Sequence, residues 1–147
     1  MVERDIELKI KKLNPKAKLP KYGSEQAAGM DLFACLDKFE VINPNEFLSI
    51  PTGIAMELYP GFEAQVRGRS GMAFNRNVFA FHGTIDADYR GEIFVLLHNC
   101  SPAPVTIKDG DRIAQMIISP VIKFSPVEVT ELSSTERGEG GKGSTGQ

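Results

Sequence analysis

The chain has 147 residues, which suits one domain with a sizeable hydrophobic core. Its 41% hydrophobic and 24% charged residues are ordinary for a globular protein, and no apolar run approaches the roughly 20 residues of a membrane-spanning helix. A formal net charge of −2 argues against broad electrostatic capture of nucleic acid, so an anionic ligand would have to meet arginines gathered locally.

Cys35 and Cys100 are too few for a disulfide framework, and the charged opening, residues 1–5, lacks the apolar core of a signal peptide. We therefore expect a reducing, cytoplasmic setting, without nucleic-acid or membrane partners. His82 and His98 are isolated and lack metal-ligand spacing, so neither is assigned to a metal site.

The hydrophobic pattern predicts an all-β fold. Alternation at residues 6–10 indicates a half-buried strand, and a lysine-rich, solvated stretch follows at 11–21. Short apolar or alternating segments, separated by turn formers, then predict a β-sandwich or barrel. These segments are 32–35, 39–42, 47–50, 54–58, 62–66, 78–81, 93–97, 105–107, 113–118 and 127–132.

At most one short helix is expected, beginning where Ser70 is predicted to cap a turn whose free amides would face an anion. Residues 133–147 contain no apolar side chain and hold five of the 14 glycines, so this tail is predicted to stay mobile until something orders it. We therefore divide the chain into a β-barrel domain, 1–132, and a tail, 133–147.

The stretch around Asp86 is the first candidate for chemistry. Thr84 and Ile85 are β-formers between Gly83 and Asp86, and 88–91 has turn residues, so a tight hairpin is predicted with its polar groups at the mouth. In a partly dry cleft, Asp86 would still ionise at neutral pH and take a proton from water. Turn chemistry alone also explains an Asp-x-Asp beside a glycine.

Two glycine-rich stretches are candidate phosphate cradles. In 67–71, glycines let backbone amides approach an anion and Arg69 supplies a fork of donors, although an exposed basic turn has the same composition. In 137–146, Arg137 and hydroxyls accompany the glycines, but the spacing and flanking strand of a Walker loop are missing, and a disordered linker is the alternative.

Two single residues leave alternatives open. Asp31 follows Gly29 at a strand start, where it would pair with an arginine, hold a metal-bound water or cap a turn. Gln115 follows the predicted hairpin turn at Asp109-Gly110, where it would reach a ligand or serve as a satisfied core amide.

Five stretches in this order resemble the five motifs of the homotrimeric dUTPase family: 28–34, 67–75, 83–99, 110–117 and 137–146. The resemblance implies a β-barrel or jelly-roll protomer in a threefold trimer, with active sites shared between subunits and the tail as a lid. It also implies Mg²⁺-dependent hydrolysis of dUTP to dUMP and pyrophosphate, which lowers dUTP and supplies dUMP for dTMP synthesis.

The resemblance assigns roles at the reacting centre. It implies that Asp86 activates the water that attacks the α-phosphorus, and that the Tyr89 ring packs against the sugar and leaves no room for a 2′-hydroxyl. The backbone of 83–85 would distinguish uracil from cytosine, and Asp31 would lie near the metal through water only.

The remaining matches concern the phosphates. Arg69, Ser70 and Gly71 match a phosphate-binding turn, and Gln115 matches a phosphate-side contact. Arg137 resembles the arginine that reaches the γ-phosphate from the tail.

The tail residues next to this arginine complete the implied nucleotide contacts: Lys142, Gly143, Ser144 and Thr145. Lys142 stands where the family usually carries an aromatic residue that stacks on the base, an interaction worth roughly 1–3 kcal/mol. We expect Lys142 to compensate in part, as a cation over the base or beside a phosphate. A second departure is Ala80, where some bacterial members place an amide near the base.

Two other functions are alternatives to the pyrophosphatase. A dCTP deaminase of the same fold, alone or bifunctional, would need groups that activate water at the cytosine ring; the tail and Tyr89 favour the pyrophosphatase. A non-catalytic nucleotide-binding β-barrel would not need the carboxylate of Asp86 together with Arg69 and Arg137.

Overall fold

The structure is a computed structural model that describes residues 6–141 and 143. One short helix and a series of strands make up the described part. In chain order they are β1 (Lys9–Lys12), β2 (Lys21–Tyr22), β3 (Met30–Phe33), β4 (Glu40–Ile42), β5 (Phe47–Pro51), β6 (Ile54–Glu57), β7 (Phe62–Arg67), α1 (Ser70–Arg76), β8 (Val78–Ala80), β9 (Gly83–Ile85), β10 (Phe94–Asn99), β11 (Val105–Ile107) and β12 (Arg112–Pro120).

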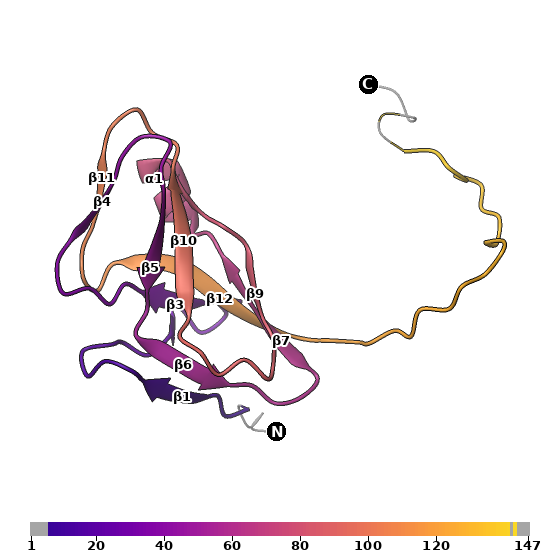
Figure 1. Ribbon diagram of the computed structural model, residues 1–147, viewed down its shortest axis with the longest axis horizontal. Coiled ribbons are helices and arrows are strands. Elements are labelled where there is room, and N and C mark those ends of the chain that lie inside the picture. The colour runs from indigo at the N-terminus through magenta and orange to yellow at the C-terminus, as the bar shows by residue number, and fades with distance from the viewer. Residues whose placement is uncertain (1–5, 142, 144–147) are drawn as a thin grey trace.

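The strands form a five-stranded sheet, β2-β3-β12-β7-β9, a three-stranded sheet, β5-β10-β8, and two strand pairs, β1-β6 and β11-β4. Each of these pairings is antiparallel. In Figure 1 the strands enclose one body, with α1 at one end of β10 and the β1-β6 pair at the opposite end. This arrangement confirms the predicted all-β fold with one short helix.

The core lies between the sheets. It is formed by the inward-facing residues, which alternate with outward-facing residues along a strand. In β10, Val95 and Leu97 are fully buried while their neighbours face outward, and Met116 of β12 and Ile50 of β5 are equally enclosed. Burying one such side chain contributes about 1.5–3 kcal/mol. The five-stranded sheet that carries several candidate residues is therefore held rigidly.

Asn99, at the end of β10, is a fully buried polar residue. Its amide donates hydrogen bonds to the carbonyls of Ile42 and Ala103, both at 2.8 Å, and its Oδ1 accepts one from the N–H of Ser101 at 2.9 Å. Because every polar group of this side chain is paired, its burial costs little and fixes the loop after β10 to the end of β4.

Neither predicted hairpin is formed. β9 pairs with β7, whereas β10 pairs with β5 and β8, so the segment around Asp86 crosses from one sheet to the other. The turn at Asp109-Gly110 likewise joins strands of different sheets. The turns themselves are present, with hydrogen bonds from Tyr89 N to Asp86 O and from Asp111 N to Lys108 O, each 3.1 Å. Local turn chemistry was therefore predicted correctly and the pairing partners wrongly.

The helix also begins one residue earlier than predicted. Arg69 is the N-cap of α1 and Ser70 is the first helical residue, so the prediction that Ser70 caps the helix is wrong. Asn77 ends the helix in the left-handed region, at φ 52° and ψ 38°, and its N–H donates to Ala73 O at 3.1 Å.

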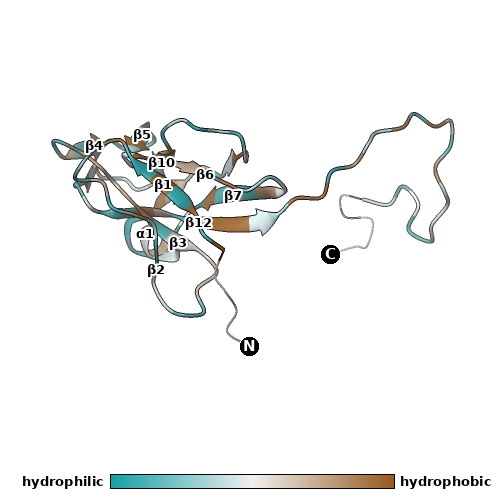
Figure 2. Cartoon of the chain, turned by 90° about the horizontal axis from the view of Figure 1, so that it is seen from below, coloured by the Kyte–Doolittle hydropathy of each residue, from teal (hydrophilic) through white to brown (hydrophobic). Residues whose placement is uncertain are grey.

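After Pro120 the chain leaves the body as an extended arm (Figures 1 and 2). The strand predicted at 127–132 is not formed in this single chain, since residues 121–132 contain no strand. Apolar side chains along the arm are strongly exposed, with 80% of Ile122, 86% of Phe124 and 88% of Leu132 accessible to solvent. The arm thus has strand-like composition without a partner in its own chain.

Candidate active site

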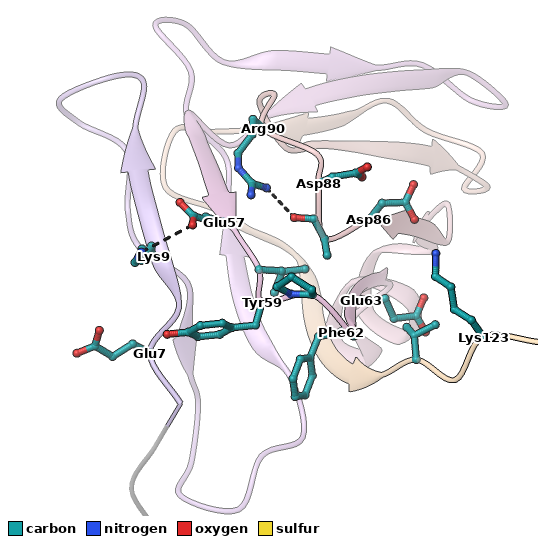
Figure 3. A pocket seen from close by; sticks show the side chains of 15 residues that line it. Glu7, Lys9, Glu57, Tyr59, Phe62, Glu63, Asp86, Asp88, Arg90 and Lys123 are labelled. Atoms are coloured by element: carbon teal, nitrogen blue, oxygen red, sulfur yellow. Dashed lines mark hydrogen bonds and ion pairs between the residues drawn. The ribbon is translucent and has the colours of Figure 1, made fainter.

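Asp86 follows the last residue of β9 and lines a cleft of about 700 Å³. Figure 3 shows Asp86 and Asp88 on one wall of this cleft, with Glu63 and Lys123 on the side where the arm leaves the body. Asp86 itself is exposed, so the prediction of a partly dry environment is wrong for the single chain.

The turn that carries Asp86 is closed by main-chain and arginine hydrogen bonds. Besides the bond from Tyr89 N to Asp86 O, Arg90 Nη1 donates to Ala87 O at 2.6 Å, drawn in Figure 3, and to Tyr89 O at 3.2 Å. These bonds restrict the backbone on both sides of the aspartate. Its carboxylate is thereby presented from a constrained position.

Asp31, Gln115 and Arg67 form one cross-strand row of β3, β12 and β7. Asp31 Oδ1 accepts a hydrogen bond from Arg69 Nε at 2.9 Å, and its Oδ2 lies 3.7 Å from Arg112 Nη1. Since only 15% of the Asp31 side chain is exposed, this ion pair is partly shielded from solvent. Of the alternatives left open for Asp31, the structure shows the arginine pair.

Gln115 is half-buried and turns toward the neighbouring cradle, where its Nε2 donates to Gly68 O at 2.9 Å. Beyond Gly68, the first turn of α1 is exposed at Ser70 and Gly71, and no described side chain caps it. A Cβ built on Gly71 would meet nothing within 4 Å. The structure therefore gathers four residues that were predicted to bind phosphate, and it places them beside Asp31: Arg69, Ser70, Gly71 and Gln115.

The Asp86 turn lies away from this phosphate cradle. In the register of β7 and β9, Ile85 stands opposite Ala64 and Gly83 opposite Val66, whereas Arg69 lies beyond the other end of β7. At about 3.3 Å per residue, this places Asp86 roughly 15–20 Å from Arg69. A single chain does not bring the two groups onto one triphosphate.

The described tail residues, 133–141 and 143, are not brought to either group. Arg137 forms a local turn, in which its Nε donates to Gly140 O at 2.7 Å. In Figure 1 the described part of the tail lies well away from the body of the protein. Gly143 is described, whereas Lys142, Ser144 and Thr145 lie outside the described residues. Their predicted contacts with the nucleotide stay predictions.

Arg112 is the site residue that sequence reasoning missed. No role was predicted for Arg112, yet it is the second cation next to Asp31. The register of β12 against β3 shifts between Arg112 and Ala114, and such an irregularity re-aims a side chain. Spacing alone gives no signal for such a shift.

A jelly-roll body that presents a carboxylate on a closed turn and gathers arginines beside a helix start belongs to the class of all-β nucleotide hydrolases. Comparison with known proteins makes this specific: the dUTPase family model matches residues 15–146. The chain belongs to the dUTPase family, which confirms the resemblance found in its motifs.

The sequences of similar proteins align with nearly the whole of this chain. The deoxyuridine 5′-triphosphate nucleotidohydrolase of Hydrogenobaculum sp. (strain Y04AAS1) is 52% identical, covering 96% of this chain and 99% of the relative. That of Nautilia profundicola is 50% identical, with 97% and 100% covered. Among solved structures, the dUTPase of Staphylococcus bacteriophage 80alpha with dUPNHPP is 27% identical, with a TM-score of 0.88 over 96% of this chain and 99% of that one.

Proposed function

We propose that this protein hydrolyses dUTP to dUMP and pyrophosphate, with Asp86 as the base that activates the attacking water. The observation that carries the proposal is the carboxylate of Asp86, held on a closed turn at the mouth of a cleft in a chain of the dUTPase family. Water attacks the α-phosphorus while Asp86 takes its proton, and the bond to the pyrophosphate breaks. A positioned base of this kind contributes about 10²–10⁴ in rate.

The phosphate cradle supplies alignment and charge. Arg69 and Arg112 face the single carboxylate of Asp31, so the cluster has a net charge of about +1 and attracts a triphosphate. The Asp31 pair also holds the Arg69 guanidinium in place before the nucleotide arrives. Gln115 and the first amides of α1 add donors, and Arg137 brings a further charge from the tail.

A Mg²⁺ ion fits this donor set only if the nucleotide brings most of its ligands. Among residues 6–141 and 143, no three His, Cys, Asp or Glu side chains gather as a metal site. Mg²⁺ is commonly bound by substrate phosphates, waters and one or two carboxylates. Asp31 would reach the ion through water, and the bound ion would neutralise charge on the phosphates.

Uracil recognition is assigned to the main chain of β9. This strand ends the order of the five-stranded sheet, so one of its edges has no strand neighbour among the described residues. An open edge offers N–H and C=O groups at fixed spacing, which can match the donor and acceptor pattern of uracil and not that of cytosine. Tyr89 lies four residues beyond β9, where its ring would pack against the deoxyribose.

The active sites are proposed to be shared within a homotrimer. The separation of Asp86 from Arg69 requires that a second copy bring its cradle to the Asp86 turn. The exposed apolar arm, residues 121–132, supports association, because these side chains would be buried as a strand on a neighbouring copy. The tail, 133–147, would then close over the nucleotide as a lid.

The cellular assignment is part of the same proposal: a cytoplasmic enzyme that lowers dUTP and supplies dUMP for dTMP synthesis. In the described part of the chain, no helix has the length and apolar character needed to cross a membrane.

A pyrophosphate-release assay with dUTP, UTP, dTTP and dCTP, with and without Mg²⁺, tests the function. We expect Mg²⁺-dependent turnover of dUTP and far lower rates for the other three nucleotides. Ammonia release from dCTP would instead indicate the deaminase. Binding of dUTP without turnover would indicate a nucleotide-binding protein.

A further inference from the structure

The side chain of Tyr89 is folded back onto its own loop. Its hydroxyl donates a hydrogen bond to the main-chain carbonyl of Glu92 at 2.8 Å, and 45% of the residue remains exposed. Part of the side chain therefore rests on the protein while another part faces solvent. A half-exposed aromatic ring with a tethered hydroxyl has a defined position from which to contact a ligand.

The carbonyl that holds the hydroxyl belongs to a rigid segment. Glu92 Oε1 accepts a hydrogen bond from Gly53 N at 2.9 Å, and Ile93 N donates to Ile54 O at 2.9 Å. The carbonyl of Ile93 accepts from both the N–H and the hydroxyl of Thr52, at 3.2 and 2.6 Å. The Tyr89 hydroxyl is thus anchored to the body of the protein and not only to a flexible loop.

Gly91 makes this packing possible. A Cβ built on Gly91 would lie 2.6 Å from Cζ and 3.0 Å from Cε2 of Tyr89, and it would also overlap the hydroxyl oxygen. Gly91 is absent from the described glycines with positive φ, so alanine adopts this backbone conformation without strain. Because the backbone after Gly91 is tied down, an added methyl group acts on the ring, which has to move.

We propose that Gly91 is a positioning residue for Tyr89: its missing side chain creates the surface on which the ring rests, and this contact fixes the ring where it excludes a ribose. The inference rests on the proposed function, since it takes Tyr89 as the group that contacts the sugar. Exclusion of a 2′-hydroxyl is steric, so the Tyr89 ring must be held in a fixed position. A displaced ring leaves room for the hydroxyl and admits UTP.

The test is the ratio of kcat/KM for dUTP to kcat/KM for UTP. Gly91→Ala is expected to lower this ratio about 10–100-fold. Tyr89→Phe removes the hydrogen bond to Glu92 without adding volume, and a smaller fall in the same direction is expected. Gly23→Ala is the matched control: its Cβ would lie 3.8 Å from Asp31 Oδ2, an ordinary contact, and any effect through the phosphate cradle applies to dUTP and UTP alike, so the ratio should stay that of the wild type.

A double-mutant cycle separates the ring from the general fold. In a Tyr89→Ala background, Gly91→Ala should change the ratio no further, because its effect is exerted through the ring. The inference is overturned if Gly91→Ala keeps the wild-type ratio, or lowers it by the same factor with and without the ring. If Gly91→Ala does not fold, an unchanged ratio in Tyr89→Phe overturns it.

Failure of the proposed function gives a different result. If the wild-type protein does not hydrolyse dUTP, the function itself is wrong. If dUTP is hydrolysed but Tyr89→Ala keeps the wild-type ratio, the sugar contact is wrong and the role of Gly91 falls with it. A low ratio in Tyr89→Ala together with a normal ratio in Gly91→Ala overturns the role of Gly91 alone.

Discussion

At the scale of single residues, two neighbouring aspartates have distinct expected roles. Asp86 and Asp88 both line the cleft, but the proposed chemistry needs only one base on the closed turn. Which carboxylate acts is decided by its position relative to the α-phosphorus and not by acidity alone. Substitution by asparagine keeps the side-chain shape and removes the proton acceptor.

Asp86→Asn is therefore expected to lower kcat by about 10²–10⁴ while the affinity for dUTP stays close to that of the wild type. Single-turnover kinetics and isothermal titration with a non-hydrolysable analogue measure the two effects separately. Asp88→Asn should cost far less in kcat. A near-normal kcat in Asp86→Asn excludes it as the base.

Gly29 lies directly against the side chain of Gln115 in the phosphate cradle. A Cβ on Gly29 would lie 2.7 Å from Gln115 Oε1 and 3.2 Å from Ile117 Cγ1, so Gly29→Ala should push the amide away from Gly68. A displaced Gln115 amide would lose its proposed hydrogen bond to the nucleotide. Loss of one neutral hydrogen bond corresponds to about 0.5–1.5 kcal/mol, or up to roughly a tenfold rise in KM. Gln115→Ala should raise KM by a similar factor, and an unchanged KM in both variants removes Gln115 from the site.

At the scale of elements, the chain's own pattern predicts most strands but not their partners. The strand predicted at 105–107 has the observed bounds, and the one at 47–50 is one residue short, because alternation and turn formers are local. The pairing of β9 with β7, and not with β10, depends on how the sheets pack. The ion pair between Asp31 and Arg69, which are 38 residues apart, was not predicted for the same reason: it depends on which strands lie side by side.

Substitution of Asn99 tests whether side-chain hydrogen bonds hold the loop after β10 against the end of β4. Asn99→Ala leaves the buried carbonyl of Ile42 without this donor, at a cost of about 1–3 kcal/mol for a group left unsatisfied, whereas the carbonyl of Ala103 keeps the hydrogen bond from Ser101 Oγ. Urea unfolding should show a lower free energy of unfolding with an unchanged m-value. Asn75→Ala, on the exposed side of α1, is the matched control, and an equal loss there contradicts the assignment.

At the scale of the whole molecule, the arm and the tail are expected to have separate roles. The arm, residues 121–132, has exposed apolar side chains that would be buried by packing on another surface. The tail, residues 133–147, has no apolar side chains to bury. This division follows the composition of the sequence. The position of the arm on a neighbouring copy cannot be predicted from composition, because it depends on a surface that only the assembled molecule provides.

Two truncations separate these roles. A chain ending at Glu136 should remain trimeric in analytical ultracentrifugation and lose most of its activity, since Arg137 and the glycine-rich lid are missing. A chain ending at Pro120 should lose the trimer as well. Full activity in the first truncation contradicts the lid, and an intact trimer in the second contradicts the arm.

The most direct test of the account is subunit mixing between two inactive variants, Asp86→Asn and Arg69→Ala. If each site takes its base from one copy and its arginine from another, refolding a 1:1 mixture should restore roughly a quarter of the wild-type activity, as expected for random closed assemblies. A mixture as inactive as its two components would show that both groups act from the same chain, and the shared site would be wrong.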